Sequence, residues 1–194
     1  MSELLSPNSK RNDKETDMNK HIAIACSFAA MIFAATNGHA QTSNAAAGNA
    51  SAADQAFLNE AIQGDLAEVN MGKLAQEKGQ SEAAKQFGQM LEQDHGQHLQ
   101  KAKDSAQQMG VTPPTEANAK QKKMYDQLAR TSGAQFDKEF AQHMIMDHKE
   151  DIGKYEKEAK SKGPLAQFAQ QTIPILQKHL QTAERLAEQK SSKR

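Results

Sequence analysis

Apolar residues recur at helical spacing along four long segments of the chain. In each segment the residues at a spacing of three or four positions are mostly apolar, which places one largely apolar stripe on a single helix face. No segment shows the alternating pattern of β-branched residues that is typical of a strand. The long helices are predicted at residues 54–78, 82–109, 133–162 and 164–189, with a short connecting helix at 115–130. The predicted fold class is therefore all-α.

Local signals set the ends of these helices. Asp54 and Ser81 are expected to cap the first two, and Ser132 with Gln135 is expected to form a capping box before the third. Gly163-Pro164 combines a helix stop with a helix start. Tight turns after the first and third long helices make those neighbours antiparallel. The pattern therefore predicts an antiparallel up-down four-helix bundle over residues 54–190.

The start of the chain, up to Ala40, differs from the rest. Ile22–Ala35 is an uncharged apolar run that is too short to span a bilayer comfortably. Basic residues precede this run, and Gly38-His39-Ala40 provides small residues at the expected cleavage site. Residues 1–40 are therefore predicted to be a secretory signal peptide, with Met1 or Met18 as its start, and the protein is expected in the periplasm or outer envelope. An uncleaved membrane anchor is the alternative.

Residues 41–53 are expected to form a low-complexity tether and residues 191–194 a solvated tail.

The composition argues against several classes of function. The single cysteine, Cys26, lies in the predicted leader, so the exported chain would contain no disulfide and no thiolate. The 24 basic residues balance the 24 acidic ones, which argues against a nucleic acid or an anionic membrane as the partner. No Gly-x-Ser-x-Gly motif and no phosphate-binding loop occur, so any hydrolase would need a metal.

Two of the predicted helices carry the same spacing of unusual residues. Phe87 stands seven residues before Asp94-His95, and Phe140 stands seven residues before Asp147-His148. A glycine, Gly110 or Gly163, then follows each aspartate at the same distance. The two helices are thus built alike, and each carries ionisable groups where a core is expected.

A count of eleven positions from the first phenylalanine of each long helix reaches an ionisable residue in every case. Eleven positions make about three helical turns, so both side chains project from nearly the same face. The four pairs are Phe57 with Glu68, Phe87 with His98, Phe140 with Asp151, and Phe168 with His179. These four ionisable residues are therefore predicted to face the core.

Counting from the two tight turns places other residues in one layer. Asp65 and His95 lie equally far from the first turn, and His148 and His179 lie almost equally far from the second. Both turns are at the same end of an up-down bundle, so these residues share one level. The predicted centre gathers His95, His98, His148 and His179 with Asp65, Glu68, Asp94, Asp147 and Asp151.

Two explanations account for so many polar groups in a core. The first is a metal site, because imidazole and carboxylate groups are ligands for Fe, Zn, Mn and Cu. The expected ligands are Glu68, His95, His98, His148 and His179. The acids Asp65, Asp94, Asp147 and Asp151 are expected around them, with Asp94 and Asp147 holding the other nitrogen of the adjacent imidazoles.

The second explanation is a metal-free histidine–carboxylate network that fixes the helix register. We favour the metal because several histidines and a glutamate share one zone. Met90 and Met144 lie near the Asp-His pairs and could indicate copper, but methionine is an ordinary core residue. Fe, Zn or Mn is therefore favoured over Cu.

Five short motifs in this chain form a recognisable set. They are Glu68-x3-Gly72-Lys73-Leu74-Ala75, Asp94-His95, Phe136-Asp137, His148, and Thr172-Ile173-Pro174-x4-His179-Leu180. Together they resemble the exported bacterial family called domain of unknown function 4142, over about residues 54–189. The resemblance implies a ferritin-like four-helix fold and a periplasmic or outer-envelope location, with Glu68, His95, His148 and His179 at the family's recurrent polar positions. It implies no established activity.

The ligand pattern departs from that of ferritin-like di-iron enzymes. Those enzymes carry Glu-x-x-His on each of two helices, whereas only Glu92-x-x-His95 fits here. The expected function is that of an exported protein that binds a transition metal, and any enzyme activity would be that of a metal-dependent oxidoreductase. The alternative is a structural or partner-binding envelope protein. Its partner would be another envelope protein or a second copy of the chain. After signal cleavage, this chain is expected to have no transmembrane segment.

Overall fold

The computed structural model describes residues 50–191 of the chain and the side chains of residues 50–188. The predicted signal peptide and most of the predicted tether and tail lie outside this range. The described range forms five helices and no strand, which confirms the all-α prediction. The helices are α1 (Ala52–Lys78), α2 (Glu82–Gln108), α3 (Ala119–Ala129), α4 (Gly133–Ala159) and α5 (Ala166–Ser191).

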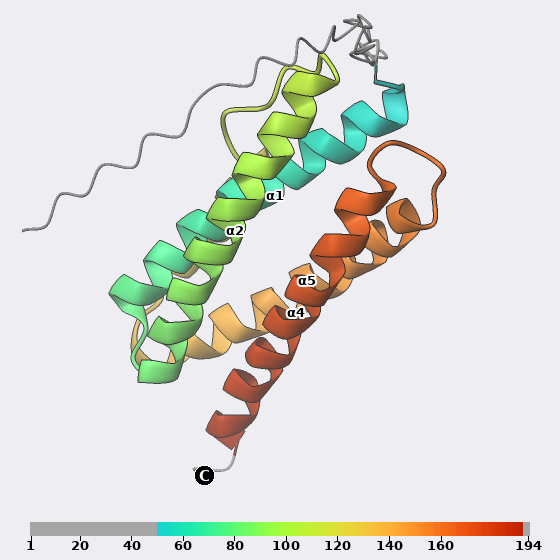
Figure 1. The fold of residues 1–194 in the computed structure, drawn as a ribbon. Coiled ribbons are helices and arrows are strands. Elements are labelled where there is room, and N and C mark those ends of the chain that lie inside the picture. Colours follow the sequence, from blue (N-terminus) through green and yellow to red (C-terminus); the bar gives the residue numbers. More distant parts are fainter. Residues whose placement is uncertain (1–49, 192–194) are drawn as a thin grey trace, which may run out of the picture. The chain divides into compact units, whose positions relative to one another are not determined.

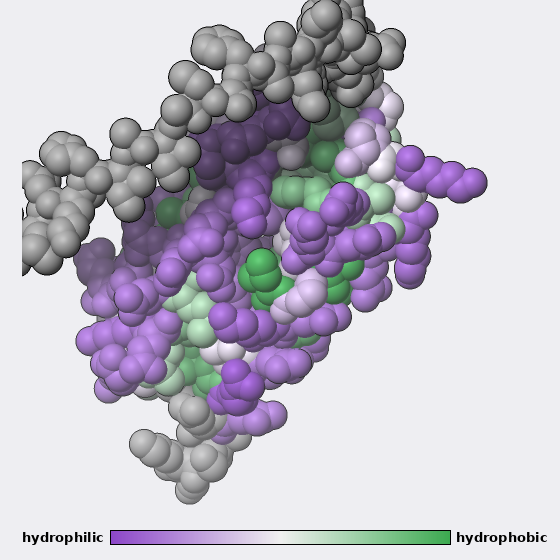
Figure 2. All heavy atoms as spheres, viewed as in Figure 1, coloured by the Kyte–Doolittle hydropathy of each residue, from purple (hydrophilic) through white to green (hydrophobic). Residues whose placement is uncertain are grey.

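The four long helices form two hairpins (Figure 1). α1 packs mainly on α2, and α4 packs mainly on α5, while the short helix α3 contacts α1 and α4. None of the described helices is apolar over the length needed to cross a bilayer. The viewed face is largely hydrophilic, with hydrophobic residues visible in the furrow between α2 and α5 (Figure 2).

Two apolar regions of the core flank a polar level. One region contains Phe87, Phe136 and Phe140, and the other contains Leu58 and Ile62. On α1, α2 and α5 the buried ionisable residues lie between these regions, and on α4 His148 follows the Phe136–Met144 part of the first region, whereas Asp137 lies within it. The buried polar residues at that level are Asp65, Glu68, His95, His98, His148, Thr172 and His179. The apolar clusters therefore fix the helices on both sides of the polar centre.

Close contact between two glycines sets the register of α1 against α2. A Cβ atom on Gly72 would lie 2.5 Å from the carbonyl oxygen of Gly88, and one on Gly88 would lie 2.6 Å from that of Gly72. Only glycine allows backbones to approach so closely. Asp65 lies seven residues before Gly72, and His95 lies seven residues after Gly88. In an antiparallel pair this contact places Asp65 opposite His95.

Asp137 ties α4 to the turn between α1 and α2. Its Oδ1 accepts a hydrogen bond from the backbone N–H of Gln80 at 2.8 Å, and its Oδ2 accepts one from the N–H of Ser81 at 3.0 Å. The Asp137 side chain is fully buried. A carboxylate from the second hairpin thus satisfies backbone donors at the N-terminus of α2 and links the two hairpins.

Several helix ends differ from the prediction. Ser51, not Asp54, caps α1, because the Ser51 hydroxyl accepts from the Asp54 N–H while the Asp54 carboxylate accepts from the Ser51 N–H. The predicted capping box of Ser132 and Gln135 is wrong. Ser132 makes no side-chain cap bond, and the Gln135 amide instead donates to Glu139 one turn along α4.

The last helix begins later than predicted. α5 begins at Ala166 instead of Pro164, and α4 ends at Ala159 instead of near Lys162. α3 also begins later, at Ala119, where Asn118 and Gln121 form a capping box. Helix ends are the least certain part of any prediction from sequence, since short-range caps compete at neighbouring positions.

Replacing Asp137 by alanine should destabilise the protein. The change removes two hydrogen bonds to a buried charge and leaves two backbone N–H groups without that acceptor, which should lower the free energy of unfolding by about 2–4 kcal/mol. Urea unfolding of the purified protein measures the loss. Asp126→Ala on the exposed face of α3 is the control, expected within about 0.5 kcal/mol of the unsubstituted protein. Equal stability of the two variants would contradict the role of Asp137.

Candidate metal centre

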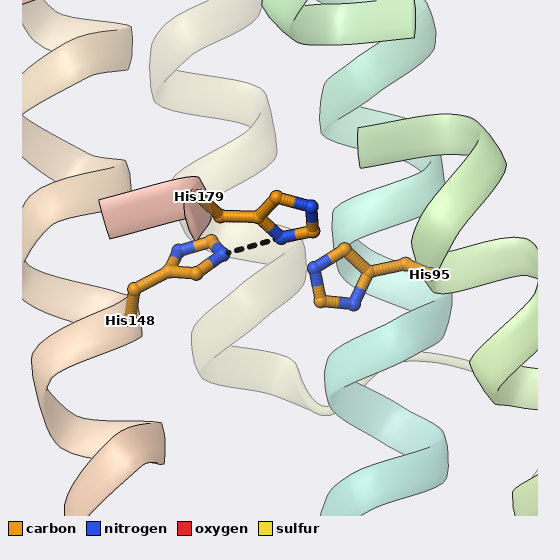
Figure 3. Close-up of side chains that lie close together, drawn as sticks. All are labelled: His95, His148 and His179. Carbon is orange, nitrogen blue, oxygen red and sulfur yellow. Dashed lines mark hydrogen bonds between the residues drawn. The ribbon is translucent and has the colours of Figure 1, made fainter. Parts of the chain in front are cut away.

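Three histidines from three helices converge at the polar level. His95 on α2, His148 on α4 and His179 on α5 each offer one ring nitrogen, and these nitrogens all lie within 4.8 Å of one another. Figure 3 shows the three rings turned towards a common point. All three residues are buried, with 6%, 1% and 0% of their surface exposed.

Hydrogen bonds assign the tautomers of His148 and His179. Nδ1 of His148 lies 3.0 Å from the carbonyl oxygen of Met144, which can only accept, so Nδ1 carries the proton. Nε2 of His179 lies 3.0 Å from Oδ2 of Asp94 and likewise donates. The remaining atoms, Nε2 of His148 and Nδ1 of His179, therefore face each other as two lone pairs 3.3 Å apart.

In its neutral form, His95 contributes a third lone pair. Its Nδ1 lies 2.9 Å from Oδ1 of Asp65, to which it donates. Its Nε2 is buried and has no hydrogen-bond partner. A buried acceptor without a partner is costly in a folded protein and calls for an explanation. The cluster thus presents three lone pairs to one point and fixes the opposite side of every ring with an acceptor.

The ionisation states suit this assignment. Burial, reinforced by the neighbouring His95 and His179, lowers the pKa of His148 well below its usual range. Burial and His95 likewise lower the pKa of His179 to about 4, although the hydrogen bond to Asp94 opposes them. Burial would raise the pKa of Asp94, but its contacts with His179 and Lys178 prevail and lower it. The imidazoles of His148 and His179 are therefore neutral at pH 7, and the neutral form is the one that binds metals.

The spacing of His148 and His179 fits a transition-metal ion. Two nitrogens bound to one tetrahedral ion at about 2.0–2.1 Å from it lie about 3.3–3.4 Å apart. The separation of 3.3 Å between His148 Nε2 and His179 Nδ1 matches this value. Metal-bound histidines also donate their other N–H to a carboxylate or a carbonyl, as all three rings do here.

His98 does not join the cluster, although it was among the expected ligands. Its Nδ1 lies 2.7 Å from Oδ2 of Asp65, and its Nε2 lies 3.0 Å from the hydroxyl oxygen of Thr172. Both nitrogens are thus engaged. Asp65 bridges His95 and His98, and although burial opposes it, these two bonds lower the pKa of Asp65. His98 holds the carboxylate that orients His95.

Glu68 also lies outside the three-nitrogen cluster. Its Oε1 is 3.9 Å from Nδ1 of His148, on the side of the ring that faces away from the cluster, and its Oε2 is buried without a partner. Burial, and then the neighbouring Asp147, raise the pKa of Glu68 well above its usual range. Burial and Asp147 also raise the pKa of Asp151 to about 6. These three acids form a separate group beside His148.

The carboxylate partners differ from those expected at the sequence level. Asp94 serves His179 on another helix instead of the adjacent His95, and the Met144 carbonyl serves His148 instead of Asp147. Adjacent residues on a helix point about 100° apart, so an Asp-His pair cannot easily bond within itself. The Met144 carbonyl lies one turn before His148, and that spacing is the signal that sequence reasoning missed.

Comparison with known families agrees with the resemblance found in the sequence. The family described as "Domain of unknown function (DUF4142)" matches residues 39–186. This match covers well over half of the chain, so the protein belongs to that family. No curated protein matches the chain significantly.

A solved structure has the same fold. It is described as "Crystal structure of DUF305 fragment from Deinococcus radiodurans", with a TM-score of 0.64 and 12% sequence identity. The match covers 72% of this chain and 98% of that one. At this identity the likeness shows a shared helical fold and nothing about function.

The contribution of His179 to the stability of the metal-free protein should decrease as the pH falls from 6.5 to about 4. The unfolded chain protonates His179 near pH 6.5, whereas the folded chain does so only near its pKa of about 4, so protons favour unfolding across this window. His179→Gln keeps a donor for Asp94 and removes the titration. The unfolding free energy of the unsubstituted protein, minus that of the variant, should fall by about 3 kcal/mol as the pH falls from 6.5 to about 4.

Urea unfolding at a series of pH values, with a chelator present, measures this difference. Comparison with the variant cancels the titration of Glu68 and Asp151, whose raised pKa values act in the opposite direction. A difference that stays constant from pH 6.5 to 4 would show that His179 is not buried in its neutral form.

Proposed function

We propose that the protein is an exported, ferritin-like four-helix protein that binds a transition-metal ion through His95, His148 and His179. One observation carries the proposal. Three buried imidazole lone pairs point at one another, while acceptors fix the opposite nitrogen of each ring. Facing lone pairs repel unless a cation lies between them.

The ligand set favours some metals over others. Imidazole nitrogens suit Zn, Cu, Fe and Ni, whereas Mn prefers carboxylates, and no carboxylate oxygen belongs to the cluster. Asp65 and Asp94 both have lowered pKa values and each accepts from a cluster histidine. Their two negative charges balance a dication, so we propose Zn²⁺, Cu²⁺ or Fe²⁺ as the ion.

A metal-free network accounts less well for the contacts. It would need an extra proton between His148 and His179, which makes one ring an imidazolium. Burial acts against that charge, since it lowers the pKa of both residues. The network would also leave Nε2 of His95 without a partner.

The site differs from a two-metal oxygen-activating centre. Glu92, the glutamate of the single Glu-x-x-His motif, accepts a hydrogen bond from Gln76 at 2.7 Å and lies 3.8 Å from Lys73. It therefore faces α1 at the half-exposed edge of α2. The proposed function is accordingly to hold or deliver one ion. A histidine site also suits an exported chain whose single cysteine lies in its predicted leader.

Substitution of the cluster histidines should abolish tight metal binding. Each of His95→Gln, His148→Gln and His179→Gln removes one ligand and should weaken Zn²⁺ binding by more than about 100-fold, since even the groups that orient such ligands contribute 10–100-fold. The full chain, purified without a polyhistidine tag, is measured by elemental analysis and competition with a chelator. His143→Gln is the control, because His143 lies half-buried on α4 and outside the cluster.

The unsubstituted protein should bind about one ion per chain and unfold at a higher temperature with the ion present. A protein that binds no Zn²⁺, Cu²⁺ or Fe²⁺ and shows no thermal shift would refute the proposal. Equal losses in His143→Gln and His148→Gln would also refute it.

Substitution of the supporting carboxylates should have a smaller effect. Asp94→Asn and Asp65→Asn keep an acceptor near the imidazole but remove its charge, so each should weaken Zn²⁺ binding by about 10–100-fold. Exposed Asp104 on α2, which bonds to Gln100, provides the control variant Asp104→Asn. Unchanged affinity in Asp94→Asn and Asp65→Asn would show that these carboxylates do not support the site.

A further inference from the structure

A small cavity between α1 and α4 extends inward to His95, one of the three cluster histidines. Glu60 and Lys154 line it from the surface, and Asp65 and His95 line it from the interior. Its volume is about 20 Å³, which is room for one water-sized species. The cavity thus has room for a single ion.

A glycine keeps this cavity open. Gly64 lines it, and a Cβ atom built there would meet only Oδ2 of Asp151, at 3.9 Å. Unlike Gly72, this glycine is therefore not required by close helix packing. The missing side chain leaves free volume between α1 and α4, and a large side chain at this position would fill it.

The outer rim already holds a cation. Nζ of Lys154 lies 2.9 Å from Glu150, 3.4 Å from Asp151 and 3.5 Å from Glu60. Three carboxylates from two helices thus surround one ammonium group. Of these acids, Glu60 and Asp151 also line the cavity.

His95 connects the cavity to the cluster. It lines the cavity, it is only 6% exposed, and its Nε2 has no partner. In Figure 3 one nitrogen of the His95 ring is turned towards His148 and His179. The His95 ring thus lies between the cavity and the other two histidines, and its unpartnered Nε2 is a ligand-capable atom that is independent of the acids at the rim.

We propose that this cavity is the entry route of the metal ion, in which Glu60 and Asp151 bind the cation first and Lys154 is the group that it displaces. The proposal rests on the proposed function. The two rim carboxylates attract a dication, and the Lys154 ammonium opposes it until it moves aside. Gly64 leaves the passage between the rim and His95.

The test compares the rates of Zn²⁺ uptake and release with the equilibrium affinity. Metal-free full-length protein is mixed rapidly with Zn²⁺, and release is followed after addition of excess chelator. Gly64→Leu should slow both rates by about tenfold or more, since it fills a passage of one-water size, while the affinity stays within about twofold. A barrier on the route changes both rates equally, whereas damage to the site changes the affinity.

Charge variants test the rim independently of the steric variant. Lys154→Gln should raise the uptake rate and Glu60→Gln should lower it, each by about two- to tenfold at low salt. Both side chains are at least partly exposed, so these variants are expected to fold. Gly153→Leu and Lys149→Gln are the controls. A Cβ on Gly153 meets nothing within 4 Å, and Lys149 pairs with Glu184 on α5.

The outcomes separate the two proposals. Uptake and release at the unsubstituted rates in Gly64→Leu, Lys154→Gln and Glu60→Gln, with Zn²⁺ still bound through the histidines, would overturn the route and leave the proposed function intact. Rate changes of the same size in Gly153→Leu and Lys149→Gln would also overturn the route. A protein that takes up no Zn²⁺ would overturn the proposed function, and the route would fall with it.

Discussion

The centre of this protein depends on how each cluster histidine divides its two ring nitrogens. One nitrogen donates to a fixed acceptor, which is Asp65 for His95, the Met144 carbonyl for His148 and Asp94 for His179. The other nitrogen is left as a buried lone pair. Leaving a buried acceptor unpaired costs about 1–3 kcal/mol. The metal-free fold therefore carries an unfavourable contact that a bound cation would remove, so cation binding would stabilise the fold.

The rest of the fold holds this arrangement in place. The Gly72–Gly88 contact brings α1 close enough to α2 for one carboxylate, Asp65, to reach both His95 and His98. Asp137 then links the α1–α2 turn to α4, the helix that carries His148. Apolar clusters on both sides of the polar level leave the imidazoles little freedom to rotate. The site thus rests on rigid helices, which favours a fixed ligand geometry.

Sequence patterns predicted the helices and the polar level, and the expected ligands included the three histidines that meet, but also His98 and Glu68, which do not join them. The three-turn spacing from Phe87 predicted an inward-facing His98, and His98 is buried. It nevertheless points to Asp65 and Thr172, while His95, at the edge of the apolar stripe, joins the cluster. α2 contacts both α1 and α5, so its buried arc is wider than one stripe. Which neighbour a histidine on that arc meets depends on helix register and rotamer, and neither can be read from spacing.

The carboxylates at this level fall into two kinds, and the division follows from their neighbours. Asp65 and Asp94 each accept from an imidazole N–H, and the pKa of each is lowered. Glu68 and Asp151 each lie beside another acid, Asp147, and burial and this neighbour both raise the pKa of each. Asp65 and Asp94 are therefore ionised. Each is hydrogen-bonded to the ring nitrogen opposite the lone pair. An ion held by the three histidines would have neutral nitrogen ligands, and the carboxylates that balance its charge would lie farther away. The ion would therefore keep more positive charge than it would with direct carboxylate ligands.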